Sequence, residues 1–300
     1  MDLRQLRYFV AVFEHGNLSR AAEDIPISQP ALTRSVKMLE DELGVELFHR
    51  HARGAAPTPA GERFYHHAKS ILAECVRARE DALEAEERLS GGVSIGVGPL
   101  FATHVLDDIV SRFCARYRLV TVTAIQGFFE DLVTMLDLGQ IEIAFCNFPV
   151  QELPESLSFE RLFEVRTQVF VASNHPLARM SPLSKEAMAE ARWATVNQPH
   201  SLNVLDALFV SDNLPAPHIA LRTNSLTLIK SVIVHADFVG LVPEHMMVKE
   251  LEAGTVVRLD VPSTPIVRDA GLIMRRDGYH RPIVEMLADD IRNTCCEIYG

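Results

Sequence analysis

Apolar and polar positions alternate at helical spacing over the first 44 residues. The apolar face of the first predicted helix is formed by Leu3, Leu6, Phe9, Val10 and Phe13. A short second helix, capped by Asn17, ends before Pro26, because proline cannot continue the helical hydrogen-bond ladder. A third helix, capped by Ser28, ends at Gly44 and buries the stripe Leu32, Val36, Leu39 and Leu43. Two short helices joined by a tight turn predict a helix-turn-helix.

The polar face of the third helix could enter the groove of a DNA duplex. This face presents Gln29, Thr33 and Lys37, with Pro30 and Arg34 beside them. Any amphipathic surface helix also has a polar outer face, so this face alone does not show that the helix binds DNA. A strand over residues 45–48 and a turn at Arg53-Gly54 follow, and Arg50 and Arg53 project from this segment. The pattern is typical of the wing of a winged helix, whose arginines can reach the minor groove, and it favours DNA binding.

A long helix is predicted downstream of this unit. Thr58 caps it, Pro59 opens it, and the run Ser90-Gly91-Gly92 ends it. Its apolar positions recur near a 3.5-residue period at Phe64, Ala68, Ile71, Cys75, Ala78, Ala82 and Leu89. A helix of about 30 residues with one apolar seam is not stable alone in water. The seam needs a partner, which is either the body of the same chain or the same helix of a second copy.

Strands and helices alternate from residue 92 onward. Strands are predicted at 93–98, 119–125, 141–148, 165–173, 193–197, 218–222, 238–243 and 265–275. Helices are predicted at 103–116, 130–138, 185–191, 202–210, 225–235 and 282–294. Such alternation predicts α/β sheets covered by helices, here in two units. Ligands of such sheets bind outside the carboxyl ends of the strands, where helix N-termini point.

The net charge of -11 is unevenly distributed along the chain. Residues 1–66 carry eight Lys/Arg and nine Asp/Glu, whereas the remaining residues carry 21 and 31. The nearly neutral first unit can still bind DNA if its cations share one face, because phosphates respond to the local field. The acidity therefore belongs mostly to the second part of the chain and does not argue against a DNA-binding first part.

Three further features of the sequence concern location and cysteine chemistry. No apolar run reaches the roughly 18 residues needed to span a bilayer. The N-terminus lacks the apolar core of a signal peptide, so we expect a cytoplasmic protein with no membrane partner. The five cysteines are scattered and form no CxxC, which indicates free thiols rather than a zinc site or a disulfide framework.

The segment AAEDIPISQPALTRSVKMLEDELGVELFHR, followed by PTPAGE, resembles the DNA-binding domain of LysR-type transcriptional regulators. The matching pattern is long and specific and runs from Ala21 to Gly61. Two departures occur at turns, where Pro26 replaces a frequent polar residue and Pro57 replaces a common leucine. The resemblance implies major-groove contacts by Gln29, Pro30, Thr33 and Arg34, a phosphate contact by Lys37, and a wing carrying Arg50 and Arg53. The rest of the chain resembles the family in organisation more than in motif.

The resemblance also implies a domain layout and a set of partners. An α-rich winged helix-turn-helix (1–58) and a linker and dimerisation helix (59–90) would precede an α/β, periplasmic-binding-protein-like effector domain (91–300). Lobe I would comprise 92–163 and 268–300, and lobe II would comprise 164–267. The implied partners are a double-stranded DNA operator, a small-molecule effector and further copies in a homodimer or homotetramer. No cofactor and no metal are expected.

We predict the effector site at the strand ends between the two lobes. The candidate residues are Leu100, Phe101, Thr103, Gln126, Cys146, Asn147, Asn197, Ser201, Asn203, Thr223, Asn224 and Val242. Helices beginning near Thr103 and Leu202 would direct free N–H groups and their dipoles into the cleft, which favours an anion. Arg166 and Arg268 lie near the implied lobe crossovers and could supply a cation. We therefore expect a small organic acid.

Two motifs admit other interpretations. Gly92–Gly96 satisfies G-x-S-x-G, but Ser94 begins a strand instead of occupying the strand-to-helix turn that a hydrolase requires, so we predict no enzymatic activity. Cys146 could be a redox sensor, although burial as a small apolar residue is the commoner fate of a free cysteine. A clamshell ligand-binding protein or an enzyme without a DNA-binding role is the alternative class. That class would not need the helical front end.

Overall fold

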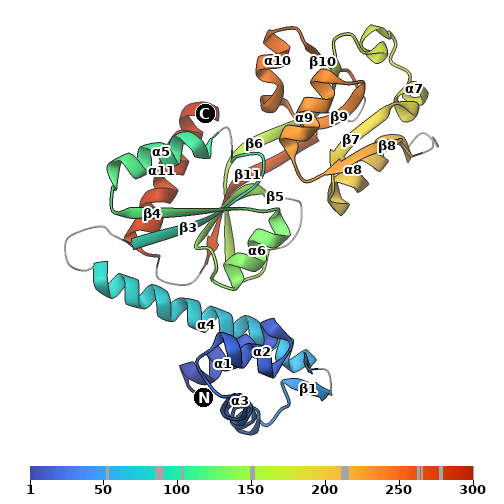
Figure 1. The fold of residues 1–300 in the computed structure, drawn as a ribbon. Coiled ribbons are helices and arrows are strands. Elements are labelled where there is room, and N and C mark those ends of the chain that lie inside the picture. The colour runs from blue at the N-terminus through green and yellow to red at the C-terminus, as the bar shows by residue number, and fades with distance from the viewer. Residues whose placement is uncertain are drawn as a thin grey trace.

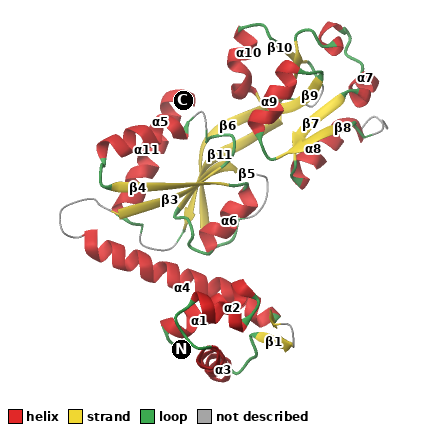
Figure 2. Cartoon of the chain, in the orientation of Figure 1, coloured by secondary structure: helices red, strands yellow, loops and turns green. Residues whose placement is uncertain are grey.

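The structure is a computed structural model that describes residues 1–51, 54–84, 91–102, 105–148, 153–210, 216–261, 264, 266–276 and 280–299. Figures 1 and 2 show a small helical unit, the long helix α4 (Pro59–Glu84), and two α/β lobes that share a sheet. Helix α4 lies between the helical unit and the first lobe. Among the helices described, none is both long and apolar enough to cross a bilayer.

The N-terminal unit contains the predicted helices. They are α1 (Leu3–His15), α2 (Leu18–Asp24) and α3 (Gln29–Leu43). The Asn17 side chain accepts hydrogen bonds from two N–H groups of α2, and Gly44 ends α3 with φ 71°, so both predicted end signals are confirmed. The predicted capping bond of Ser28 is wrong, because its side chain makes none. Pro30 at the second helical position lacks an N–H and removes one of the two donors that a cap would use.

The predicted wing is a hairpin of β1 (Phe48–His51) and β2 (Gly54–Pro57). Its first strand begins at Phe48, three residues later than predicted. The buried Glu40 side chain explains the shift, because its Oε1 accepts hydrogen bonds from the backbone N–H groups of Leu47 (2.9 Å) and Phe48 (3.1 Å). These bonds hold residues 45–47 as a connection against α3.

The first half of α4 belongs to the helix-turn-helix core. The predicted cap is confirmed, since Thr58 Oγ1 accepts a hydrogen bond from the N–H of Gly61 at 3.0 Å. Ala68 is fully buried, and the Tyr65 ring stacks on Phe13 of α1 with centroids 4.0 Å apart. Tyr65 and Lys69 both donate to Oε1 of Glu14 at 2.9 Å. The start of α4 is therefore fixed to α1.

The two lobes share one mixed sheet with the order β4-β3-β5-β11-β6-β9-β7-β8, and β10 pairs with β6. Its strands are β3 (Gly91–Val97), β4 (Val120–Gln126), β5 (Ile143–Phe148), β6 (Leu157–Ala172), β7 (Arg192–Val196), β8 (Ile219–Thr223), β9 (Phe238–Pro243), β10 (Val256–Leu259) and β11 (Ile266–Arg275). The long antiparallel strands β6 and β11 run through both lobes and join them (Figure 1).

Helices cover both faces of this sheet. They are α5 (Leu106–Arg116), α6 (Phe129–Asp137), α7 (Lys185–Glu190), α8 (Pro199–Val210), α9 (Leu226–His235), α10 (Val248–Glu252) and α11 (Pro282–Tyr299), with 3-10 turns η1 (Pro176–Arg179) and η2 (Glu244–Met247). In the first lobe, α5 and α11 pack over one apolar face and α6 over the other. In the second, α8 and α9 contribute to separate apolar clusters.

The predicted α/β alternation is confirmed, but several element bounds differ. Strand β6 begins at Leu157, whereas the sequence predicted a strand only over 165–173. The first half was missed because the exposed charged residues Glu160, Arg161 and Glu164 interrupt its apolar pattern. The short elements β10 and α10 were not predicted. The helix expected to start at Thr103 begins at Leu106, and Thr103 itself lies outside the described residues.

Candidate nucleic-acid interface and interlobe cavity

The outer face of α3 gathers the predicted polar side chains. Gln29, Pro30, Arg34 and Lys37 are exposed and Thr33 is partly exposed. Leu32, Val36 and Leu39 on the opposite face are buried against α1 and α2. Because α3 packs through one apolar stripe, its polar face is left open over about two turns, as major-groove entry by a helix requires.

The wing has a rigid base beside α1. The N–H of Ala55 donates to the carbonyl oxygen of Gly16 at 3.0 Å. A Cβ on Gly54 would lie 2.4 Å from that oxygen, so this position requires glycine. Arg50 stands on β1 opposite Ala55, but its side chain and the whole of Arg53 lie outside the described part of the chain. Their contact with DNA stays a prediction.

A cavity of about 210 Å³ lies where the two lobes meet. Its wall is mainly apolar and consists of Gly98, Pro99, Leu100, Phe101, Gly127, Phe128, Phe129, Cys146, Val196, Val204, Leu226, Leu241, Pro243 and Ile266. Its polar lining consists of Glu130, Asn147, Thr167, Thr195, Gln198, Ser201 and Arg268. Mostly apolar walls with a few convergent polar groups are the usual composition of a small-molecule site.

Strand register brings three of the polar residues onto one sheet face. Asn147 pairs with Ala270, and Arg268 lies two residues from Ala270 on the same strand, so both side chains are on one side. Thr167 pairs with Ile266, which places it on that side too. The Oδ1 atom of Asn147 is buried and has no hydrogen-bond partner within the described residues. Such an acceptor is costly to leave unsatisfied and indicates a donor that enters from the cavity.

Helix α6 begins at the cavity. Phe128 occupies its N-cap position and provides no side-chain capping bond, so the first N–H groups of α6 receive no acceptor from the N-cap residue. The positive end of the helix dipole therefore faces the cavity, while Glu130 in the first turn contributes a negative charge to the same lining. Together these groups suit a ligand that carries one negative charge and a separate hydrogen-bond donor.

The predicted effector residues divide into two groups. Leu100, Phe101, Cys146, Asn147 and Ser201 line the cavity. The other described candidates, which do not line it, are Gln126, Asn197, Asn203, Thr223, Asn224 and Val242. Val242 is fully buried in lobe II between the lining residues Leu241 and Pro243, because successive strand residues face opposite sides. Thr223 is the last residue of β8, which is the outermost strand of its half of the sheet, and Asn224 follows it.

Several lining residues were missed from the sequence. Phe128, Phe129 and Glu130 follow the predicted strand end at Gln126-Gly127, and Gln198 follows Asn197. In each case the cavity begins one to four residues beyond the marked strand end, at the start of the next helix. Arg268 lines the cavity, whereas Arg166 pairs with Val267 and therefore faces the other side of the sheet.

Cys146 has the environment of a structural thiol. Its exposure is 2%, and burial, followed by the negative charge of Glu130, raises the pKa of its thiol to about 12. A reactive cysteine has a lowered pKa and an accessible sulfur. The geometry therefore favours the apolar role over the redox role.

Comparisons with known proteins match both parts of this architecture. Residues 3–62 match the family of bacterial regulatory helix-turn-helix proteins of the lysR type, and residues 86–296 match the LysR substrate binding domain. An uncharacterised HTH-type transcriptional regulator, YdcI of Escherichia coli, is 29% identical over 97% of this chain and 95% of its own. A hydrogen peroxide-inducible genes activator of Pectobacterium carotovorum is 26% identical over 97% and 96%.

Solved structures of full-length regulators have the same fold. LysG of Corynebacterium glutamicum with bound effector Arg superposes with a TM-score of 0.70 at 19% identity, covering 99% of each chain. A full-length OxyR variant of Pseudomonas aeruginosa superposes with a TM-score of 0.67 at 23% identity, covering 97% of this chain and 95% of its own. The open polar face of α3, the long α4 and the two lobes around a cavity thus occur together in a known class of DNA-binding transcriptional regulators with an effector-binding domain. The chain belongs to the LysR family.

Proposed function

We propose that this regulator responds to a compact monocarboxylic acid that has an apolar body and a hydroxyl or amino donor. The observation that carries the proposal is the interlobe cavity itself, in which Arg268 and the α6 N-terminus lie among aromatic and aliphatic walls. Its volume of about 210 Å³ is below the roughly 300–1,000 Å³ of drug-sized sites, which favours a small metabolite. Asn147 Oδ1 and Glu130 would accept the ligand's donor group.

On the DNA side, we propose that α3 enters the major groove of a double-stranded operator. Gln29 and Arg34 carry side chains able to make two hydrogen bonds to adenine and guanine, and Thr33 can contact a base or a thymine methyl. Lys37 would contact a phosphate, and Arg50 and Arg53 would serve the wing. Residues 1–58 would act as the DNA-binding domain, 59–90 as the linker, and 91–300 as the effector domain with lobe II at 164–267.

LysR regulators function as oligomers, and we propose that α4 forms the dimer contact here. Of the predicted apolar seam, Phe64 and Ala68 pack into the helix-turn-helix core, but Ile71, Cys75, Ala78 and Ala82 remain partly or fully exposed. A long helix with an uncovered apolar seam is stabilised by pairing with the same helix of a second copy. Such a homodimer also supplies the second recognition helix that a palindromic operator needs, and two dimers could form a tetramer.

Isothermal titration calorimetry with matched ligands tests the effector proposal. 4-Hydroxyphenylacetate should bind more tightly than phenylacetate, which lacks the donor, and far more tightly than 4-hydroxyphenylacetamide, which lacks the charge. Arg268→Gln should weaken binding of the acid about 10- to 150-fold, as expected for loss of a charge-assisted hydrogen bond of roughly 1.5–3 kcal/mol. Arg166→Gln, on the opposite sheet face, should leave affinity unchanged.

Two outcomes would overturn this proposal. One is binding of compounds that lack a carboxylate, whether neutral or cationic, while a wider set of small carboxylates fails. The other is equal loss of affinity in Arg268→Gln and Arg166→Gln. A gel shift with the DNA upstream of the protein's own gene tests the operator half independently.

A further inference from the structure

Helix α6 connects the interlobe cavity to the linker helix. At its N-terminus, Phe128, Phe129 and Glu130 line the cavity. At its C-terminus, the carbonyl oxygens of Leu136 and Asp137 accept hydrogen bonds from the Arg275 side chain of β11, and the Leu136 carbonyl also accepts one from the N–H of Gly139. Nine residues at about 1.5 Å each separate these ends by roughly 13 Å. One helix therefore extends from the interlobe cavity to the Arg275 contacts near the linker helix.

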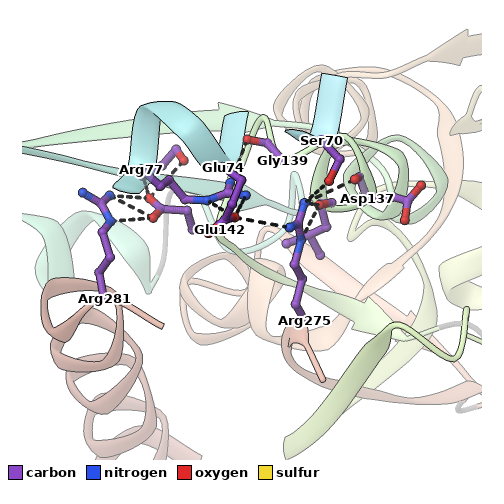
Figure 3. Close-up of polar contacts among 10 residues, drawn as sticks. Ser70, Glu74, Arg77, Asp137, Gly139, Glu142, Arg275 and Arg281 are labelled. Carbon is purple, nitrogen blue, oxygen red and sulfur yellow. Dashed lines mark hydrogen bonds and ion pairs between the residues drawn. The ribbon is translucent and has the colours of Figure 1, made fainter. Parts of the chain in front are cut away.

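The C-terminus of α6 is held in a polar contact with α4 that we call the linker clamp. It consists of Ser70, Glu74 and Arg77 of α4 together with Gly139 and Arg275 of lobe I (Figure 3). Arg275 Nη2 donates to the Leu136 carbonyl at 3.1 Å and to Ser70 Oγ at 3.2 Å. The same guanidinium therefore joins the end of α6 to the linker.

Arg77 makes the reciprocal contact from the linker side. Its Nη1 donates to the carbonyl oxygen of Gly139 at 3.2 Å, and its Nε donates to Glu74 at 3.0 Å. Gly139 has φ 68°, and a Cβ at this position would lie 2.8 Å from Cβ of Ala73. The linker therefore passes so close to the turn after α6 that only glycine fits between them.

The clamp is a crowded arrangement of like charges. Glu74 lies within 3.8 Å of Arg275 Nη1 while it also pairs with Arg77, so the two guanidinium groups share one carboxylate. Burial, followed by the positive charge of Arg77, lowers the pKa of Arg275. Its contacts to α6 depend on the exact position of backbone carbonyl oxygens, and a small displacement of the helix end would break them.

The middle of α6 is packed so closely against the sheet that a displacement at one end of the helix is not taken up within it. Leu132 and Leu136 are fully buried against the sheet, and a Cβ on Gly96 would lie 2.6 Å from Leu132. Close-packed helices of this kind shift as units of about 1–2 Å between discrete packings. Displacement at Phe129 therefore moves the carbonyl groups at the clamp.

We infer that α6 is the element that transmits occupancy of the interlobe cavity to the linker helix, through the linker clamp. A ligand that displaces Phe128 and Phe129 shifts α6, rearranges the clamp, and changes the angle at which α4 carries the recognition helix. This coupling rests on the proposed effector site, but it is a property of the protein that can be measured without the ligand.

A double-mutant cycle in the full-length protein tests the coupling. Phe129→Ala perturbs the cavity end and Arg77→Gln removes the bond to Gly139, and operator affinity is measured by fluorescence anisotropy for both single variants and the pair. Sites this far apart are normally additive within about twofold in the dissociation constant. We expect the pair to deviate from additivity by at least fivefold. Thermal denaturation establishes that each variant is folded.

Two matched cycles define the route. Arg79→Gln, two residues along α4 and exposed on the face away from the clamp, should be additive with Phe129→Ala. Leu241→Ala alters the cavity wall from β9 and should be additive with Arg77→Gln. If the effects of Phe129→Ala and Arg77→Gln on operator affinity are additive, or if the Leu241→Ala cycle shows equal coupling, transmission through α6 is refuted. Failure of the folded wild type to bind DNA would instead refute the proposed function.

Discussion

Cys146 should be inert to peroxide, although one relative of this chain is a hydrogen peroxide-inducible activator. With its pKa raised to about 12, about one thiol in 10⁵ is ionised at pH 7, against roughly 3% for an unperturbed thiol of pKa about 8.5. The ionised fraction is therefore about 3,000-fold lower. A more basic thiolate is a better nucleophile, and the logarithm of its rate constant rises by about 0.4–0.5 per pKa unit, so this effect offsets roughly 30-fold of the 3,000-fold difference. The chemistry alone therefore slows Cys146 about 100-fold, and its burial slows it further.

Alkylation by iodoacetamide, followed by peptide mass spectrometry, measures this difference within one molecule. The exposed Cys296 is the internal reference. At pH 7 we expect Cys296 to be modified at least 100-fold faster, and the Cys146 rate to rise about tenfold per pH unit because the thiolate population does. Operator binding should be unchanged by peroxide in both the wild type and Cys146→Ser. Comparable labelling of the two cysteines at pH 7, or a peroxide response that disappears in Cys146→Ser, would refute the reasoning.

Three other predictions concern DNA binding, stability and assembly. Arg34→Ala should weaken specific operator binding at fixed salt by about 5- to 150-fold, as loss of a bidentate base contact of about 1–3 kcal/mol requires, and an unchanged gel shift would remove Arg34 from the interface. Arg281→Met leaves the Glu142 carboxylate, which is only 9% exposed, without its 2.8 Å ion pair. It should lower the free energy of unfolding by about 3–5 kcal/mol, or the calorimetric Tm by roughly 6–20 °C, with part of the loss restored by adding Glu142→Gln. Ala78→Glu should make the protein monomeric in sedimentation at micromolar concentration, whereas Val76→Glu, off the proposed seam, should not.

The N-terminal unit was predictable because its signals are local. Helix ends at Asn17 and Gly44 depend on residues within one turn, and the buried positions Leu32, Val36 and Leu39 of α3 follow from a period of 3.6. Leu43, predicted as the fourth buried position of that stripe, is exposed in the last turn of α3. The missing capping bond of Ser28 has a local cause as well, since Pro30 removes a donor that Ser28 would have capped. The late start of β1 at Phe48 depends instead on Glu40, eight residues earlier, whose side chain accepts backbone hydrogen bonds only after the fold forms.

The cavity was predictable in outline but not residue by residue. Strand ends mark the edge of the sheet where ligands bind, and five candidates lie there. The sequence does not show which side of a strand end faces the other lobe, so it could not distinguish Leu241, which lines the cavity, from Val242, which does not. Strand order is not readable from the sequence either, so the position of Thr223 on the outermost strand could not be foreseen. The contact of Arg77 with Gly139 joins residues 62 positions apart, so no periodicity in the sequence could reveal it.

The two ends of α4 differ in how easily they can rearrange, and this determines where the molecule bends. At the helix-turn-helix, Tyr65 stacks on Phe13, Ala68 is fully buried, and Glu14 accepts two hydrogen bonds that, against the effect of burial, lower the pKa of its carboxyl group. Separating that joint would expose apolar surface at a cost of about 25 cal/mol per Å². At the clamp, the arginines bond carbonyl oxygens that water can replace, at a net cost of about 1 kcal/mol each. Motion between the lobes and the DNA-binding unit is therefore expected at the clamp, with α4 and the recognition helix moving together.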